Sequence, residues 1–150
     1  MNMKRPVSAR EARRILSSVQ RTQSFWLCTN ENLRSLSSLV SSLQKVDDDV
    51  FRYHVNREKN DFEKWIREVV KDKELAREIA RVKTKETLIR KISERVSELK
   101  AILKRHIAVV RAAARRMALS SRRRKGRSRR AKRVPVRRAL KKRRIKGVGR

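Results

Sequence analysis

The chain has 150 residues, with 45 Lys and Arg, 15 Asp and Glu, and a formal net charge of +30. One small domain is the most that this composition allows, because the strongly charged part of the chain cannot add to a hydrophobic core. Cys28 is the single cysteine and only two histidines are present, which excludes an intramolecular disulfide and a zinc site of the CxxC or HxxxH kind.

No segment of the chain has the composition of a signal peptide or of a membrane-spanning helix. The stretch after Pro6 is interrupted by Arg10, Glu11 and Arg13, so it lacks the apolar core of a signal peptide. A run of about 18 apolar residues, as a membrane-spanning helix requires, is also absent. We therefore expect a cytoplasmic protein.

The charge is distributed unevenly along the chain. Residues 25–100 contain 17 basic and 14 acidic side chains, as is ordinary for a soluble domain, and residues 1–24 contain six basic and one acidic. Residues 101–150 contain 22 basic side chains and no acidic one, since the last acid is Glu98. Such a density of positive charge requires a polyanion to neutralise it, and nucleic acid is the polyanion that we expect.

The folded part is predicted to be helical, because only three Gly and two Pro occur and apolar residues recur at spacings of three and four. Strands have little support. The first helix is predicted over residues 9–20, with Ser8 and Glu11 forming the SxxE pattern of a capping box at its start. Its short apolar edge is made of Ile15, Leu16 and Val19.

The second helix is predicted to begin near Thr29 or Asn30, since either side chain can accept a backbone hydrogen bond at the N-cap. One face of this helix is apolar and the opposite face is mainly Ser. The apolar face comprises Leu33, Leu36, Leu39, Val40 and Leu43.

Three short helices are predicted next, each with polar residues at its start that can cap it. The capping residues are Asp47, Asp48 and Asp49 for the third helix, Asn60 or Asp61 with Glu63 for the fourth, and Asp72 for the fifth. The apolar residues of these helices are, in the same order, Phe51 and Val55, then Phe62, Trp65, Ile66 and Val69, then Leu75, Ile79 and Val82.

The longest helix is predicted from Thr84 to about Leu119, with apolar residues at steps of three or four. These are Leu88, Ile92, Val96, Leu99, Leu103, Ile107, Val110, Ala114 and Met117. At 1.5 Å per residue the helix would span roughly 50 Å, which is longer than a domain of this size needs. Its second half is therefore expected to project beyond the core.

The projecting half combines an apolar stripe with a basic side, and three interpretations are open. It could extend the core, lie on an anionic membrane, or dock an apolar edge on a partner while Arg111, Arg115 and Arg116 meet phosphate. The partner interpretation is preferred, because the basic run continues for thirty more residues without the bulky aromatics that anchor a membrane-surface helix.

Residues 120–150 are predicted to be disordered when free, because like charges repel and apolar residues are few. Pro135 can begin a short helix through Lys142 once phosphates screen this repulsion. Of the 22 basic residues after position 100, 16 are Arg, which can grip phosphate with two hydrogen bonds or stack on an exposed base. Scattered aliphatic residues such as Val136 and Leu140 also suit contacts within a folded RNA. A solvated tail or a nuclear-localisation signal is the simpler alternative.

The candidate RNA-binding residues are the basic side chains of the projecting helix and the tail. They are Arg111, Arg115, Arg116, Arg122, Arg123, Arg124, Lys125, Arg127, Arg129, Arg130, Lys132, Arg133, Arg137, Arg138, Lys141, Lys142, Arg143, Arg144, Lys146 and Arg150. We expect no catalytic residue, no metal site, no cofactor and no small-molecule substrate.

These patterns together predict an all-α fold, a small helical bundle with a long projecting C-terminal helix and a basic extended tail. The predicted parts are a basic N-terminal extension with a short helix (1–24), a helical domain (25–100), the projecting basic end of the long helix (101–119) and the Arg-rich tail (120–150). The aromatic residues all fall between positions 25 and 65, so the core is expected to be centred there. They are Phe25, Trp26, Phe51, Tyr53, Phe62 and Trp65.

A group of less common residues recurs at fixed spacing in the middle of the chain. The group comprises Phe51, Tyr53, His54, Asn60, Asp61, Phe62, Trp65 and Ile66. With this pattern, residues 25–100 resemble a small helical, mainly archaeal domain of unknown function. The resemblance implies a helical domain and an archaeal source but names no activity, and the basic tail extends beyond it in a manner similar to ribosomal proteins.

His54 raises the question of catalysis. His54 and Glu58 are four residues apart, so on one helix the carboxylate would orient the imidazole, with Asp61 and Cys28 as possible neighbours. A structural histidine that bonds a helix cap explains the same residues more simply. The chain also lacks a Gly-rich phosphate loop, a GxSxG motif and a metal-ligand cluster, so an enzyme is not expected.

The leading hypothesis is a noncatalytic structural RNA-binding protein, most concretely an archaeal ribosomal or ribosome-associated protein. Its partners would be rRNA and neighbouring ribosomal proteins, with the tail penetrating and neutralising rRNA. One alternative is an architectural DNA-binding or chromatin protein, which Lys-rich tails would favour. Another is a protein-binding scaffold that uses Phe51, Trp65 and the stripe of Ile and Leu residues as its contact surface and the basic tail as a tether.

Overall fold

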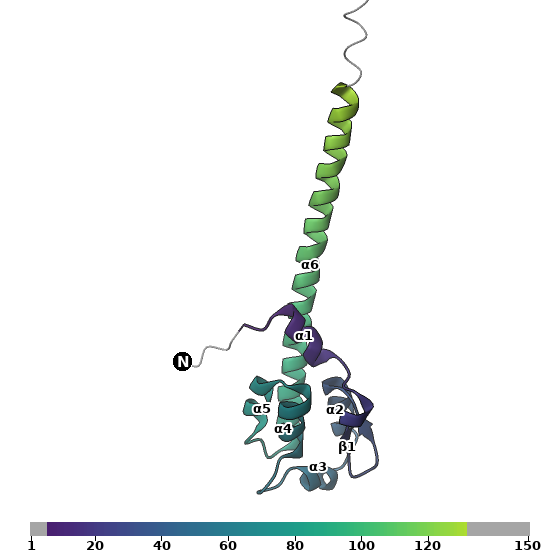
Figure 1. Ribbon diagram of the computed structural model, residues 1–150. Helices are drawn as coiled ribbons and strands as arrows, with labels where there is room; N and C mark the ends of the chain where they lie inside the picture. The colour runs from purple at the N-terminus through teal and green to yellow at the C-terminus, as the bar shows by residue number, and fades with distance from the viewer. Residues whose placement is uncertain (1–5, 132–150) are drawn as a thin grey trace, which may run out of the picture. The chain divides into compact units, whose positions relative to one another are not determined.

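The computed structural model describes the backbone of residues 6–131 and the side chains of residues 6–121. The chain divides into two units at His106 and Ile107. We call the described part of the first unit, residues 6–106, the compact unit, and the described part of the second, residues 107–131, the C-terminal segment. Figure 1 shows the elements that make them up.

Helices account for most of the described residues. In chain order the elements are α1 (Ala9–Leu16), the 3₁₀ turn η1 (Arg21–Gln23), β1 (Phe25–Trp26), β2 (Asn32–Leu33), α2 (Leu36–Leu43), α3 (Asp48–His54), α4 (Asp61–Trp65), the π-helical turn η2 (Ile66–Val70), α5 (Lys73–Ile79) and α6 (Lys85–Ala131). The prediction of a mainly helical fold with one long C-terminal helix is confirmed. A two-stranded antiparallel sheet, β1–β2, is the exception among the described residues.

Helix α1 begins where the sequence predicts and packs into the core. The Ser8 hydroxyl accepts a hydrogen bond from the Glu11 backbone N–H at 3.1 Å, which is the expected N-cap. The helix ends at Leu16 rather than at Gln20, because Ser17 has an extended backbone and bonds back to the Arg14 carbonyl. Ala12 and Ile15 are fully buried in the same core as the later helices. The compact unit therefore includes α1, and the prediction of a separate N-terminal extension over residues 1–24 is wrong for this helix.

The prediction of a helix that starts at Thr29 or Asn30 is wrong for residues 29–35. These residues include the turn and the second strand of a β-hairpin. Phe25 pairs with Leu33, and Asn30 at the turn has a left-handed backbone with φ 63°. Such a conformation cannot begin an α-helix, and Asn tolerates it better than most residues. Helix α2 instead starts after Ser35, whose side chain and that of Ser38 cap each other's backbone N–H.

Three further helix starts follow the predicted positions. Asn60 caps α4 by accepting from the Glu63 N–H at 3.0 Å, and Asp72 caps α5 by accepting from the Leu75 N–H at 3.2 Å. Asp47 precedes α3 without a side-chain cap bond. The fourth helix does not continue regularly to Val69, because the chain widens into η2 after α4 and shifts the inward position to Val70.

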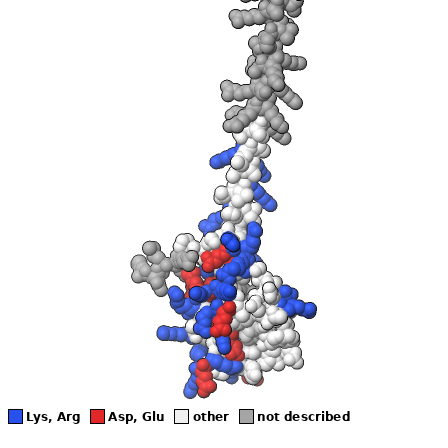
Figure 2. Space-filling view, viewed as in Figure 1, with Lys and Arg blue, Asp and Glu red and all other residues white. Residues whose placement is uncertain are grey.

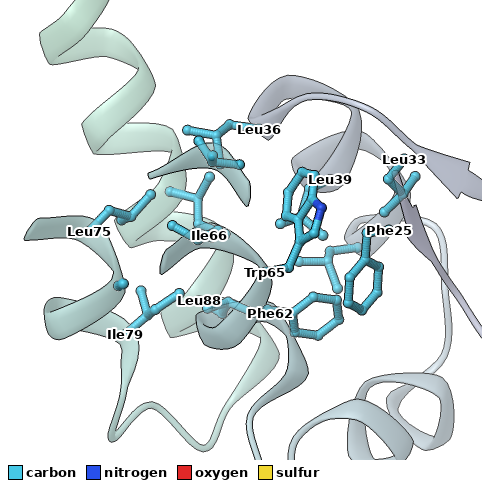
Figure 3. Close-up of a cluster of buried hydrophobic side chains, with 14 of the residues drawn as sticks. Phe25, Leu33, Leu36, Leu39, Phe62, Trp65, Ile66, Leu75, Ile79 and Leu88 are labelled. Atoms are coloured by element: carbon cyan, nitrogen blue, oxygen red, sulfur yellow. The ribbon is translucent and has the colours of Figure 1, made fainter. Parts of the chain in front are cut away.

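The core is aromatic at its centre, as expected, but it contains four of the six aromatic residues. Phe25 and Phe62 have ring centroids 5.0 Å apart, and Phe25 lies edge-on to Trp65 at 5.9 Å. The Trp65 indole N–H donates to the Gln23 carbonyl at 2.9 Å, so its polar atom is satisfied. Figure 3 shows these rings against leucine and isoleucine side chains from several elements. Trp26 and Tyr53 are each 61% exposed and lie outside the core.

Helix α6 supplies one wall of this core with its first turns. Its inward side chains Leu88, Ile92, Val96 and Leu99 are buried. In Figure 1, α5 lies to the left of this part of α6, α2 and β1 lie to the right, and α4 overlaps α6 in the view. The helix continues to Ala131, twelve residues beyond the predicted end, since Arg and Ala favour the helical backbone. The helix predicted after Pro135 lies outside the described residues.

A buried ion-pair network joins α6 to the start of α5. The Arg95 guanidinium donates to both Asp72 carboxylate oxygens, at 2.8 and 3.1 Å, and to Glu98 at 2.9 Å, and it lies 3.1 Å from Glu74. Burial alone would lower the pKa of Arg95, but the hydrogen bonds that Arg95 donates to the Asp72 and Glu98 carboxylates outweigh burial and raise the pKa. Asp72 thus pairs with a buried cation and caps α5 at the same time.

Candidate nucleic-acid interface

The C-terminal segment presents predicted RNA-binding arginines on an exposed helix. Arg111, Arg115 and Arg116 all belong to α6 and are exposed to solvent. Arg111 and Arg115 are four residues apart and lie on one side of the helix, whereas Arg116 lies about 100° further round. Figure 2 shows Lys and Arg side chains along the described surface of this segment. The segment contains no acid, so none of these arginines has an ion-pair partner within it.

The same segment carries an apolar side that is also exposed. Ile107, Val110 and Met117 recur at spacings of three and seven and are 41%, 52% and 74% exposed. The prediction that this part of the apolar stripe would lie beyond the core agrees with these exposures. Apolar and basic side chains therefore share the same few turns of α6, as in the partner-docking interpretation.

The remaining candidate residues fall into two groups. The first group belongs to α6, with a helical backbone, and comprises Arg122, Arg123, Arg124, Lys125, Arg127, Arg129 and Arg130. The second group, from Lys132 to Arg150, lies outside the described residues. Lys104 and Arg105 are exposed basic residues of the compact unit that the candidate list omits. Both lie in the acid-free stretch after Glu98, and that feature of the sequence could have identified them.

His54 has a structural environment on both of its ring nitrogens. Nε2 accepts a hydrogen bond from the Cys28 backbone N–H at 3.2 Å, so the proton of the neutral ring sits on Nδ1 and is donated to Asp61 at 3.1 Å. Helix α3 ends at His54, so Glu58 is not one helical turn further along, and the predicted pairing of the two on one helix face is wrong. Asp61 is the first residue of α4, so His54 links the hairpin to two helices.

The carboxylate of Asp61 is held between two donors. Its Oδ2 lies 2.8 Å from Lys59 Nζ and 3.1 Å from His54 Nδ1. Burial raises the pKa of Asp61, but the hydrogen bonds from Lys59 and His54 outweigh burial and hold the pKa below its ordinary value. A carboxyl group with a lowered pKa stabilises the fold above the unfolded-state pKa of about 3.9, and this contribution is lost as pH falls through the folded-state pKa.

We therefore expect Asp61→Asn to lower the free energy of unfolding at neutral pH and to matter less and less below about pH 4. Urea unfolding of both proteins between about pH 7 and about pH 3 measures the difference. Glu58→Gln, which changes an exposed carboxylate nearby, is the matched control and should have little effect at any pH. A difference between wild type and Asp61→Asn that does not change with pH would contradict the assignment.

The scaffold alternative loses two of the residues that it requires. Phe51 and Trp65, the aromatic part of the proposed contact surface of a scaffold, are 3% and 6% exposed and belong to the core. Within the described residues, no helix is both long and apolar enough to span a bilayer. The same part of the chain contains no cluster of three or more His, Cys, Asp or Glu side chains that could hold a metal ion.

The fold and the basic segment define a small, mainly α-helical protein with a strongly basic C-terminal helix. Residues 18–121 match the family of unknown function DUF5752, and the chain belongs to this family. The match covers the hairpin, α2 to α5 and the first part of α6, and it ends immediately before the Arg122–Lys125 run. Searches among curated proteins and among solved structures find no match.

Proposed function

We propose that this protein is a noncatalytic, structural RNA-binding protein, most concretely an archaeal ribosomal or ribosome-associated protein. The observation that carries the proposal is the acid-free stretch after Glu98, in which 22 basic residues occur over positions 101–150. Its described part is an exposed helix that carries Arg111, Arg115 and Arg116. In this proposal the compact unit is the folded base and the basic residues neutralise phosphates of rRNA.

Arginine is the reason to prefer RNA over duplex DNA. A guanidinium binds phosphate through two hydrogen bonds and stacks on exposed bases, and folded RNA offers both targets in loops and bulges. The exposed Ile107, Val110 and Met117 suit an irregular partner with apolar contact points, such as base faces or a neighbouring protein, better than a regular phosphate backbone. A duplex-binding protein would need only the charge.

The first test removes the three exposed arginines and measures how the RNA affinity of the protein then depends on salt. The variant Arg111→Gln, Arg115→Gln, Arg116→Gln should reduce the slope of log affinity against log salt by about two to three, because each lost phosphate contact removes about one released counterion. Fluorescence anisotropy with a labelled rRNA fragment, between about 50 and 200 mM salt, measures the slope. The same titration with duplex DNA of equal length separates RNA from DNA.

A control variant loses the same number of positive charges from the compact unit instead of the C-terminal segment. Arg57→Gln, Arg77→Gln, Arg81→Gln removes three exposed arginines from the compact unit and lowers the net charge by the same amount. It should leave the slope near the wild-type value. Equal slopes for the two triple variants would mean that the protein binds through net charge alone, and tighter binding to duplex DNA than to the rRNA fragment would favour the chromatin alternative.

A further inference from the structure

One part of the compact unit is nearly free of charge. Between Thr22 and Gln44 only Glu31 and Arg34 are charged, whereas 40% of the whole chain is charged. Both residues are exposed, but their charges are opposite and each makes a hydrogen bond within the fold: Glu31 accepts from the Ser42 hydroxyl at 2.5 Å, and Arg34 donates to the Val19 carbonyl at 3.1 Å. The hairpin β1–β2 and helix α2 therefore present a surface with little net charge.

The outward side of these elements is polar, with one large aromatic residue. Trp26 is 61% exposed, because Phe25 on the same strand faces the core and successive side chains alternate. Asn32, the cross-strand neighbour of Trp26, is also exposed, as are Ser37 and Ser41 on α2 and Gln44 at its C-terminal end. We call these five residues the neutral face. In Figure 2 the side of the compact unit that carries α2 and β1 is largely white.

The contact between Glu31 and Ser42 joins the two elements of this face, since it ties the hairpin turn to the last part of α2. Depletion of charge together with an exposed Trp is typical of the centre of a protein–protein interface. It is unsuited to RNA, which needs cations beside the bases that stack. Tyr53 is a useful contrast, because it is equally exposed but has Lys59 Nζ 4.9 Å from its ring centroid.

We propose that the neutral face binds the same face of a second copy of this chain. Each copy has a net charge of +30, so two copies repel wherever their basic surfaces meet. The neutral face allows close approach with few opposing like charges, and a two-fold axis near Trp26 would pack the two indole rings against each other. Such a dimer would present two basic segments to one polyanion, which goes beyond the binding proposed for a single chain.

The dimer and the RNA complex have opposite salt dependence. An uncharged interface between two basic chains is opposed by long-range repulsion, and salt screens that repulsion, so added salt should tighten the dimer. Salt weakens RNA binding, because it lowers the gain from counterion release. The sign of the salt effect therefore distinguishes self-association through the neutral face from association bridged by residual nucleic acid.

The experiment is sedimentation equilibrium of the full chain, freed of nucleic acid by nuclease and high-salt washing. A reducing agent prevents a disulfide through the exposed Cys28. We expect a monomer–dimer equilibrium whose dissociation constant falls several-fold between about 50 and 300 mM salt. Trp26→Arg should raise the dissociation constant at least about tenfold, because it places like charges opposite each other.

Ser37→Arg tests the same face at an exposed position outside the core, and it should also weaken the dimer. Tyr53→Arg adds the same charge at an equally exposed aromatic position on α3 and should not. A chain that stays monomeric up to about 100 μM, or a dimer that loosens with salt, would overturn the proposal. So would equal effects of Trp26→Arg and Tyr53→Arg.

The RNA titration of Trp26→Arg keeps this proposal separate from the proposed function. A monomeric variant still has its whole basic segment, so its salt slope per chain should remain at the wild-type value. Loss of the dimer with that slope retained supports the neutral face as a self-association surface. If the wild-type chain is monomeric and Trp26→Arg changes RNA affinity, the neutral face contacts RNA. That outcome would overturn the dimer proposal.

Discussion

Replacing Asp72 with Ala is expected to lower the free energy of unfolding by about 3–5 kcal/mol, because it leaves the Arg95 guanidinium buried without its main partner. Asp72 and Arg95 are 2% and 6% exposed. The substitution also removes the cap that Asp72 provides for the Leu75 N–H of α5. A loss of this size is a large part of the total stability of a small domain. Urea unfolding followed by circular dichroism measures it.

The charge and the cap can be separated by further variants. Asp72→Asn keeps a side chain that can cap α5 but removes the negative charge, so its cost reports mainly the ion pair. In the double variant Asp72→Ala, Arg95→Met the buried cation is also gone, and the total loss should be smaller than the sum of the two single losses. Additive losses would show that Asp72 and Arg95 do not stabilise the fold as a pair.

An exposed pair on the same helix is the matched control. Arg90 donates to Glu94 at 2.9 Å, one turn along α6, and both side chains are about 60% exposed. Arg90→Met should cost no more than about 0.5 kcal/mol, since water replaces the lost contact. If Asp72→Ala lowers the free energy of unfolding by less than about 1 kcal/mol, the buried network stabilises the fold no more than an exposed ion pair does. That result would contradict the prediction.

The helix starts were predictable from sequence because capping is local. Ser8, Asn60 and Asp72 each accept a hydrogen bond from the backbone N–H three residues later, so the pattern and the contact occupy the same short stretch. The hairpin was not predictable in this way. Leu33 and Leu36 have helical spacing, and the pairing of Phe25 with Leu33 depends on a left-handed turn at Asn30 that no Gly or Pro announces.

The candidate sites depend on the sequence to different degrees. The basic segment is a property of composition, so Arg111, Arg115 and Arg116 could be named without a structure. The neutral face could not, because it depends on which of two adjacent aromatics turns inward and on the internal contacts of Glu31 and Arg34. Long-range packing, rather than local pattern, therefore decides where an uncharged surface forms on this protein.

Deletion of residues 122–150 is expected to have the largest effect on RNA binding. It removes 17 of the 45 basic residues. If about ten of them contact phosphate, affinity for an rRNA fragment at low salt should fall by at least about a thousandfold, because counterion release supplies most of such affinity. In a sucrose gradient of native lysate, the full chain should travel with ribosomal particles and be released by ribonuclease, while the deleted chain should stay at the top.

A charge-preserving variant tests the role of arginine itself. Replacing all 12 arginines of residues 122–150 with Lys keeps the net charge of +30 but removes bidentate phosphate binding and stacking. Duplex DNA affinity should change by no more than a few-fold, whereas affinity for the folded rRNA fragment should fall roughly tenfold, the equivalent of one lost base stack. Anisotropy at matched salt gives both values.

The two tail variants lead to different conclusions if the expectation fails. Continued co-sedimentation of the deleted chain at moderate salt would mean that the compact unit or residues 107–121 hold it on the particle, and the tail mechanism would be lost. Equal rRNA affinity for the Lys variant and the wild type would mean that charge alone acts, which removes the argument for RNA over DNA. Because neither variant alters the neutral face, self-association should persist in both, so the basic segment and the dimer surface can be judged independently.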